Sequence, residues 1–103
     1  MKKVTTLLPT TFNDGSEVPQ ETMQNILQSL WDTFGGLTVE GMVEGHWIDQ
    51  ADNQHYQDRS LKVTILMEPE KLETAKAMVR EIRETLKQVC MYFEVNDVDF
   101  ELL

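Results

Sequence analysis

The sequence predicts one α+β domain in which two helices cover one face of an antiparallel sheet. In residues 37–67, apolar residues take most odd positions and polar residues most even positions, which is the period of a strand. A polar loop at residues 49–58 divides this stretch into two arms of a hairpin. Segments of helical period flank the hairpin, and a short strand lies beyond each helix. The order strand, helix, strand, strand, helix, strand predicts a ferredoxin-like βαββαβ sandwich.

The first strand and first helix follow from local signals. Residues 3–8 are rich in β-branched residues and end before Pro9, which cannot donate to a strand ladder. Pro19 suits the first position of a helix, because its missing N–H would have no partner there. An apolar stripe follows at spacings of three and four, made of Met23, Ile26, Leu27, Leu30 and Phe34. Gly35-Gly36 predicts the end of this helix, and Trp31 is expected to cover the edge of the stripe.

The length of the polar loop decides which side chains of the hairpin share a face. A two-residue turn at residues 52–53 would place Val43 opposite Lys62, which sets an apolar side chain against a polar one. We therefore expect a loop of three or five residues, a wider loop, or a bulge. These alternatives place Val43 opposite Leu61 or Val63, with the apolar odd positions facing the helices.

The second helix and the C-terminal strand are predicted in the same way. Pro69 opens the helix, and acidic residues near its start and basic residues near its end agree with the helix dipole. Residues 91–95 alternate as the last strand, and residues 98–102 alternate again, which predicts an extended C-terminus with a further strand. Cys90 is expected to be a buried small hydrophobe. The buried seam of the helix is predicted to be Leu72, Ala75, Val79, Ile82, Leu86 and Val89.

The even positions of the hairpin form the sheet face that the helices leave open. This face mixes apolar and polar side chains, and its predicted members are Thr38, Glu40, Met42, Glu44, His46, Lys62, Thr64 and Leu66. Exposed apolar patches and unpaired strand edges favour association. We therefore predict a binding protein that forms a homodimer through this open face, or that encloses a small polar ligand there.

Composition and charge narrow the classes of function for a chain of 103 residues. Nine basic residues against 18 acidic ones give a net charge of −9. Such a field repels phosphate backbones and anionic headgroups, so neither a nucleic acid nor a membrane is an expected partner. An alternative role is that of an acidic decoy that captures a basic protein. Cys90 is the only cysteine and the N-terminal apolar run is short, so we expect a cytoplasmic protein.

Candidate site residues lie on the hairpin and its loop. A histidine oriented by a carboxylate can act as a base, and one register pairs His46 with Asp58 whereas another pairs His46 with Ser60. The alternative function is therefore a small enzyme in which His46 acts with Asp58 or Tyr56. Arg59 can clamp a carboxylate. The predicted ligand-binding residues are His46, Trp47, His55, Tyr56 and Arg59.

Metal, cofactor and enzyme signatures are weak in this sequence. His46, Asp49 and His55 match a metal-ligand count, but their spacing fits no family of sites, so we expect neither a metal nor a cofactor. The chain has no phosphate-binding glycine loop, no Gly-x-Ser-x-Gly elbow and no paired cysteines. A binding function is therefore favoured over an enzymatic one.

Several short passages of the chain resemble a known family when they are taken in order. They are Phe12-Asn13-Asp14-Gly15 with Val18, then residues 34–39, 45–49 and 60–63, and the helix-to-strand passage through Gln88-Val89. Their order and spacing are similar to those of a family of small uncharacterised bacterial proteins, a domain of unknown function that often carries a lipoprotein-type leader. The resemblance implies a compact α+β domain and no particular reaction. Because this sequence lacks the leader, an envelope location is not expected.

Overall fold

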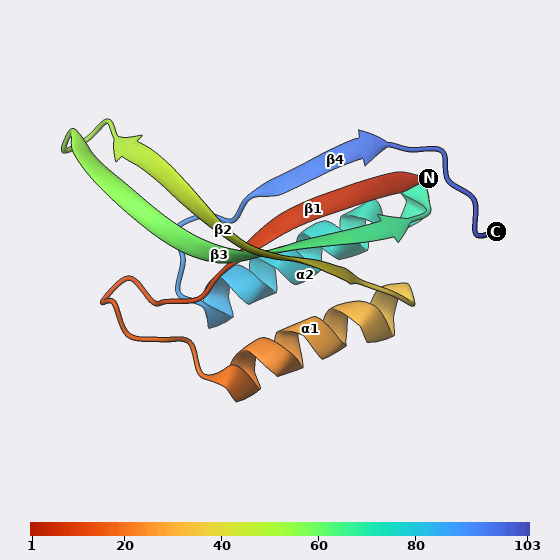
Figure 1. The fold of residues 1–103 in the computed structure, drawn as a ribbon, viewed down its shortest axis with the longest axis horizontal. Coiled ribbons are helices and arrows are strands. Elements are labelled where there is room, and N and C mark those ends of the chain that lie inside the picture. Colours follow the sequence, from red (N-terminus) through yellow and green to blue (C-terminus); the bar gives the residue numbers. More distant parts are fainter.

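The computed structural model describes all 103 residues and has the predicted order of elements (Figure 1). The sheet is antiparallel with strand order β2-β3-β1-β4, and both helices lie against one of its faces (Figure 1). The predicted ferredoxin-like fold is thus confirmed. Its elements are β1 (Lys2–Pro9), α1 (Gln20–Phe34), β2 (Thr38–Asp49), β3 (Gln54–Met67), the 3₁₀ turn η1 (Pro69–Lys71), α2 (Leu72–Thr85) and β4 (Phe93–Asp97).

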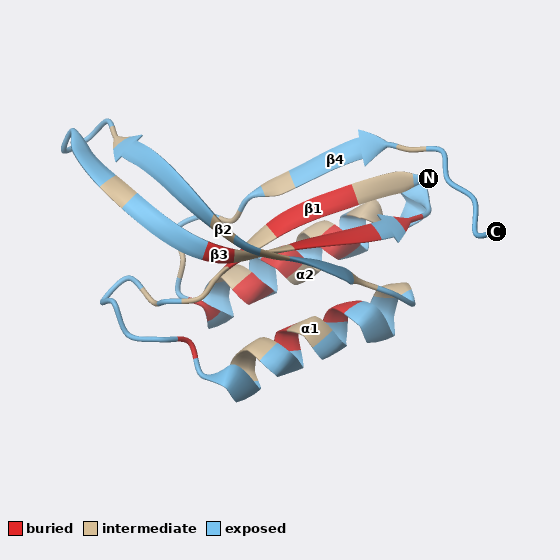
Figure 2. Cartoon of the chain, in the orientation of Figure 1, coloured by how far each residue is buried: buried red, intermediate tan, exposed pale blue.

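The core lies between the helices and the two central strands. Even positions of β1 pair with odd positions of β3 on the helix side, as in Leu8 opposite Leu61 and Val4 opposite Ile65. Buried residues gather there on β1, β3 and both helices (Figure 2). The predicted apolar alternation of the central strand is therefore correct over its second half. The buried apolar residues of this cluster are Val4, Leu8, Val18, Ile26, Leu30, Val63, Ile65, Met67, Ala75, Ile82 and Leu86.

The predicted prolines lie near the helix starts, although Pro69 opens η1 and α2 itself begins at Leu72. Pro19 precedes the first residue of α1, and Gly35 ends the helix in the left-handed conformation with φ of 82°. The Gly35 N–H donates to the carbonyl of Trp31 at 2.8 Å. In α2, Lys87 takes a φ of 55° and turns the chain away after Leu86.

That turn overturns two predictions about the segment that follows α2. Val89 is 88% exposed and does not continue the buried seam. Cys90 is exposed as well, so it is not the buried hydrophobe that was expected. Both residues lie in the connection to β4, beyond the last helical turn that packs on the sheet.

A bulge in β2 decides the register of the hairpin. Val39 pairs with Val63, whereas Gly41 pairs with Lys62, so Glu40 is the extra residue. Gly41 has a φ of 111°, a conformation that is almost restricted to glycine. A bulge, one of the expected alternatives, therefore exists. The loop between the paired residues Asp49 and Gln54 has four residues, 50–53, so the expected loop of three or five residues is wrong. Val43 lies opposite Ser60, so both predicted partners of Val43 are wrong as well.

Beyond the bulge, the residues of β2 change sides relative to the prediction. Val43 and Trp47 lie on the open side of the sheet, opposite Ser60 and Tyr56. Met42, Glu44 and His46 lie on the side that faces the helices, so their predicted place on the open face is wrong. The extra residue explains the exchange. Side chains of a strand alternate between the two faces of the sheet, so one inserted residue moves every later side chain to the opposite face.

The distal hairpin extends beyond the helices and curls away from them (Figure 1), which gives the molecule a longest dimension of 46 Å. Both strands are almost wholly exposed in this part (Figure 2). At the other end, β4 stops at Asp97, and the Val98 N–H donates to the Met1 carbonyl at 3.1 Å. The predicted further strand after β4 does not form. Neither helix has the length and apolarity that crossing a membrane requires.

Candidate functional site

A stacked aromatic pair occupies the open side of the distal hairpin. Trp47 and Tyr56 face each other across the two strands, with ring centroids 4.6 Å apart and planes inclined by 19°. The indole Nε1–H of Trp47 donates to Asp58 Oδ2 at 2.8 Å. The Tyr56 hydroxyl donates to Asp52 Oδ2 at 2.8 Å. Each ring is thus held both by its neighbour and by a carboxylate.

The strand backbone beside this aromatic pair is not covered by a side chain. Gly45 lies opposite Asp58 on the open side, two residues before Trp47. A Cβ atom built on Gly45 would meet no other atom within 4 Å. Trp47 is 48% exposed, so the indole forms an accessible wall next to this uncovered strip of backbone. We define the aromatic surface as Gly45, Trp47, Tyr56 and Asp58; a planar ring can stack there beside a carboxylate acceptor.

The loop at the tip of the hairpin fixes the tyrosine. Asp52 accepts a hydrogen bond from the Gln54 N–H at 3.0 Å and a second one from Tyr56. These two bonds lower the pKa of the Asp52 carboxyl, because both favour its charged form. The same hydroxyl bond raises the pKa of Tyr56. At neutral pH the loop therefore holds an ionised Asp52 against a neutral phenol, a role of Asp52 that the sequence analysis missed.

A chain of polar side chains occupies the opposite side of the hairpin. His46 Nε2 lies 2.7 Å from Glu44 Oε2, and His46 Nδ1 lies 2.9 Å from His55 Nε2. The two imidazole rings are stacked with centroids 5.0 Å apart. A neutral His46 that donates from Nε2 and accepts at Nδ1 satisfies both contacts. The hydrogen bond from His46 lowers the pKa of Glu44.

The predicted pairing of His46 with Asp58 is wrong. His46 lies opposite Gln57, while Asp58 lies opposite Gly45 on the other side of the strands and is bonded to Trp47. The alternative partner Ser60 is also wrong, since Ser60 faces Val43. Tyr56 lies on the same side as Asp58, so neither residue can orient His46. Catalysis by His46 stays a prediction, and its carboxylate partner in this structure is Glu44.

The predicted ligand-binding residues therefore divide between two surfaces. Trp47 and Tyr56 share the open side, whereas His46 and His55 share the side that faces the helices. Arg59 lies with the histidines, directly opposite Glu44, and its carbonyl accepts a hydrogen bond from the Thr10 N–H at 3.1 Å.

The histidines and Asp49 do not converge on one point. Asp49 Oδ1 accepts a hydrogen bond from the Ala51 N–H at 2.8 Å within the loop. No group of three or more His, Cys, Asp or Glu residues is arranged to hold a metal ion.

Residues of the C-terminal tail and of the open face of the sheet line a common groove. The groove has a volume of about 660 Å³ and lies between the sheet and this tail. Lys62 Nζ lies 3.9 Å from Glu40 Oε2 beside it. The predicted open-face residues Thr38, Glu40, Thr64 and Leu66 line the groove, together with Lys3 and Phe100. The predicted open face is therefore a groove at this end and an exposed aromatic surface at the other.

Comparison with known proteins identifies structures but no sequence family. No family model and no curated protein matches the sequence. A phage SAM lyase in complex with S-methyl-5′-thioadenosine has a TM-score of 0.69 at 15% identity, over 93% of this chain and 80% of the lyase chain. The apo phage SAM lyase has a TM-score of 0.63 at 13% identity, over 92% of this chain and 78% of the lyase chain.

CutA1 from Pyrococcus horikoshii is also similar, with a TM-score of 0.61 at 14% identity over 99% of this chain and 87% of the CutA1 chain. The chain shares the fold of these proteins. The compact α+β domain that the family resemblance implied is confirmed, whereas that family is not identified by any sequence match.

Proposed function

We propose that the chain is a small-molecule-binding protein that holds an adenosyl thioether, such as S-methyl-5′-thioadenosine, on the aromatic surface. The observation that carries this proposal is the exposed indole of Trp47, held by Tyr56 and Asp58 beside the bare backbone of Gly45. A purine stacks favourably on such a ring, with about 1–3 kcal/mol per base. The second oxygen of Asp58 is available to accept a hydrogen bond from a ribose hydroxyl.

Charge favours this class of ligand over nucleotides. The net charge of −9 disfavours a ligand that carries several phosphates, while a neutral thioether or a cationic sulfonium meets no such repulsion. The phage SAM lyase of similar fold was solved with S-methyl-5′-thioadenosine bound. This ligand offers a purine for stacking, ribose hydroxyls for Asp58 and no phosphate.

Binding can be measured by the fluorescence of Trp47. The chain has two tryptophans, so Trp31→Phe leaves Trp47 as the only indole reporter. We expect S-methyl-5′-thioadenosine to quench this fluorescence saturably. By calorimetry, Trp47→Ala should weaken binding by about 5- to 150-fold, the equivalent of one lost stacking contact.

A glycine pair provides the matched control for this experiment. Gly45→Ala should also weaken binding, because its methyl group fills the strip beside the indole while meeting no protein atom within 4 Å. Gly36→Ala is equally unhindered, lies away from the aromatic surface and should leave binding unchanged. Equal affinities of wild type, Trp47→Ala and Gly45→Ala would contradict the proposed site.

The similarity to a lyase makes an enzyme the second candidate function. Incubation with SAM and chromatographic detection of S-methyl-5′-thioadenosine separates the two functions. Release of the thioether faster than in a protein-free sample establishes an enzyme, and binding without such release establishes a binding protein. In the enzymatic case, His46→Ala tests the histidine directly, since unchanged turnover removes His46 from the reaction.

We also propose that the chain self-associates through the free edge of β2. This strand pairs only with β3, so its second edge presents unpaired backbone groups over 12 residues. Exposed apolar side chains follow the same strand: Val39, Met42, Trp47 and Ile48. Antiparallel pairing of two β2 edges is self-complementary and makes a closed dimer.

Light scattering at high micromolar concentration should therefore report a dimer. Ile48→Lys should shift it to the monomer, because a charge at a strand edge opposes pairing and Ile48 is 61% exposed in the single chain. Val89→Lys changes a residue that is 88% exposed and lies away from β2, so it should leave the dimer intact. A wild-type protein that is monomeric throughout would exclude this association.

A further inference from the structure

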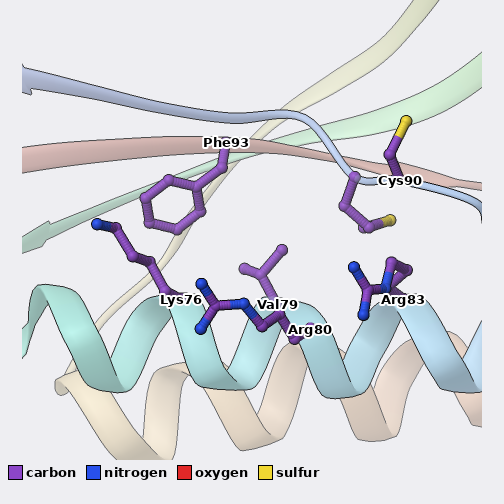
Figure 3. Close-up of a pocket in the computed structure, with 7 residues that line it drawn as sticks. Lys76, Val79, Arg80, Arg83, Cys90 and Phe93 are labelled. Atoms are coloured by element: carbon purple, nitrogen blue, oxygen red, sulfur yellow. The ribbon is translucent and has the colours of Figure 1, made fainter.

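A cleft with a basic lining lies between α2 and the chain that leads into β4. Its volume is about 330 Å³. Lys76, Arg80 and Arg83 line the cleft from the helix, and Figure 3 shows Phe93 and Cys90 across from them. Val79 and Met91 supply apolar surface in the same cleft. We call this site the basic cleft; it lies on the helix side of the sheet, apart from the aromatic surface.

The concentration of positive charge here is unusual for this chain. The protein has nine basic and 18 acidic residues, yet three of the nine line the basic cleft and no acidic residue does. The helix dipole explains a cation in the last turn, where Arg83 lies. The dipole does not explain Lys76 and Arg80, which lie before the last turn. Lys76, Arg80 and Arg83 follow one another at spacings of four and three residues, so all three lie on one face of α2.

The three cations are weakly neutralised by their surroundings. Lys76 Nζ lies 3.4 Å from Glu73 Oε1, and an Arg83 guanidinium nitrogen lies 3.3 Å from Glu84 Oε1. The two carboxylates are 82% and 78% exposed, so these pairs contribute little and exchange readily with water. Arg80 makes no ion pair. The Arg80 guanidinium therefore has no carboxylate partner in the lining of the cleft.

We propose that the basic cleft binds an organic phosphate monoester with an aromatic or other apolar body. Two guanidinium groups, on Arg80 and Arg83, match a phosphate group through paired N–H donors, and Lys76 adds a third positive charge. The apolar body packs on Phe93 and Val79. The volume is at the lower end of the range of small-molecule sites, which suits a compact ligand of about one ring and one phosphate.

Phenyl phosphate is the probe that tests this site. In titrations followed by amide NMR, we expect saturable shifts of the α2 amides around Arg80 and of residues 90–93. Arg80→Gln and Arg83→Gln should each weaken binding by about tenfold or more, because a charge-assisted contact to phosphate is lost. Glutamine has a helix propensity close to that of arginine, so α2 is retained. Lys62→Gln, on the open side of the sheet, is the matched control and should leave the affinity unchanged.

Two companion probes separate the contributions of the anion and the ring. Benzyl alcohol lacks the phosphate and inorganic phosphate lacks the ring, so each should bind far more weakly than phenyl phosphate. Added salt should weaken phenyl phosphate binding, since the exposed cations are screened. Absence of shifts at millimolar phenyl phosphate, or shifts that Arg80→Gln leaves intact, would overturn the proposal. Neither result bears on Trp47, so this site and the aromatic surface are tested independently.

Discussion

Replacing Leu30 by alanine is expected to lower the free energy of unfolding by about 2–5 kcal/mol, since a buried methyl cluster is lost and a cavity remains. Leu30 is 1% exposed and lies on the inner face of α1. No side-chain hydrogen bond or ion pair joins α1 to another element, so apolar packing alone docks this helix. At about 4 °C per kcal/mol, the melting temperature should fall by roughly 8–20 °C.

Urea unfolding followed by circular dichroism measures this loss. Gln28→Ala, two residues away on the exposed side of α1, is the control and should change the midpoint little, because alanine is a good helix former. A Leu30→Ala midpoint equal to that of Gln28→Ala would mean that α1 is not packed on the sheet as described.

The helices were predictable because their signals are local. Pro19 and Pro69 mark their beginnings, Gly35 supplies the left-handed stop of α1, and the apolar stripes have a helical period. The end of α2 lacked such a signal. Lys87 takes a positive φ there, and a lysine in a sequence does not predict a positive φ. The predicted positions of Val89 and Cys90 failed for this reason.

The candidate site was harder to predict because it depends on a single inserted residue. The sequence placed His46 and Trp47 on a strand correctly, but it left His55 and Tyr56 in the polar loop, whereas both lie in β3. The sides on which all four side chains lie depend on the bulge at Glu40. The one available signal was Gly41, since an isolated glycine within a strand indicates a bulge. With the bulge located there, Trp47 falls opposite Tyr56 and His46 beside Glu44, and the pairing of His46 with Asp58 is excluded.

Gly41→Ala should destabilise the protein by about 1–3 kcal/mol, because a side chain at this φ is strained. The φ of Gly41 is 111°, and no atom lies within 4 Å of an added Cβ, so the strain comes from the backbone and not from a clash. At Gly36 an added Cβ meets no atom within 4 Å either, and the φ is not positive. Gly36→Ala therefore separates backbone strain from the loss of glycine itself, and it should lower the free energy of unfolding much less than Gly41→Ala. Urea unfolding of both variants gives the comparison.

Deletion of Glu40 should remove the cost of Gly41→Ala. Without the extra residue, Val39 opposite Val63 is followed directly by Gly41 opposite Lys62, which is a regular ladder that needs no positive φ. The pairing beyond Gly41 is unchanged, so the deletion variant should keep the contact between Trp47 and Tyr56 in near-UV circular dichroism while losing the local bend.

A double-mutant cycle measures this coupling, since Glu40 and Gly41 act through the same backbone conformation. If Gly41→Ala costs as much in the deletion variant as in the wild type, the bulge is not the source of the strain. If the cost disappears, the bulge is the source of the glycine requirement at position 41.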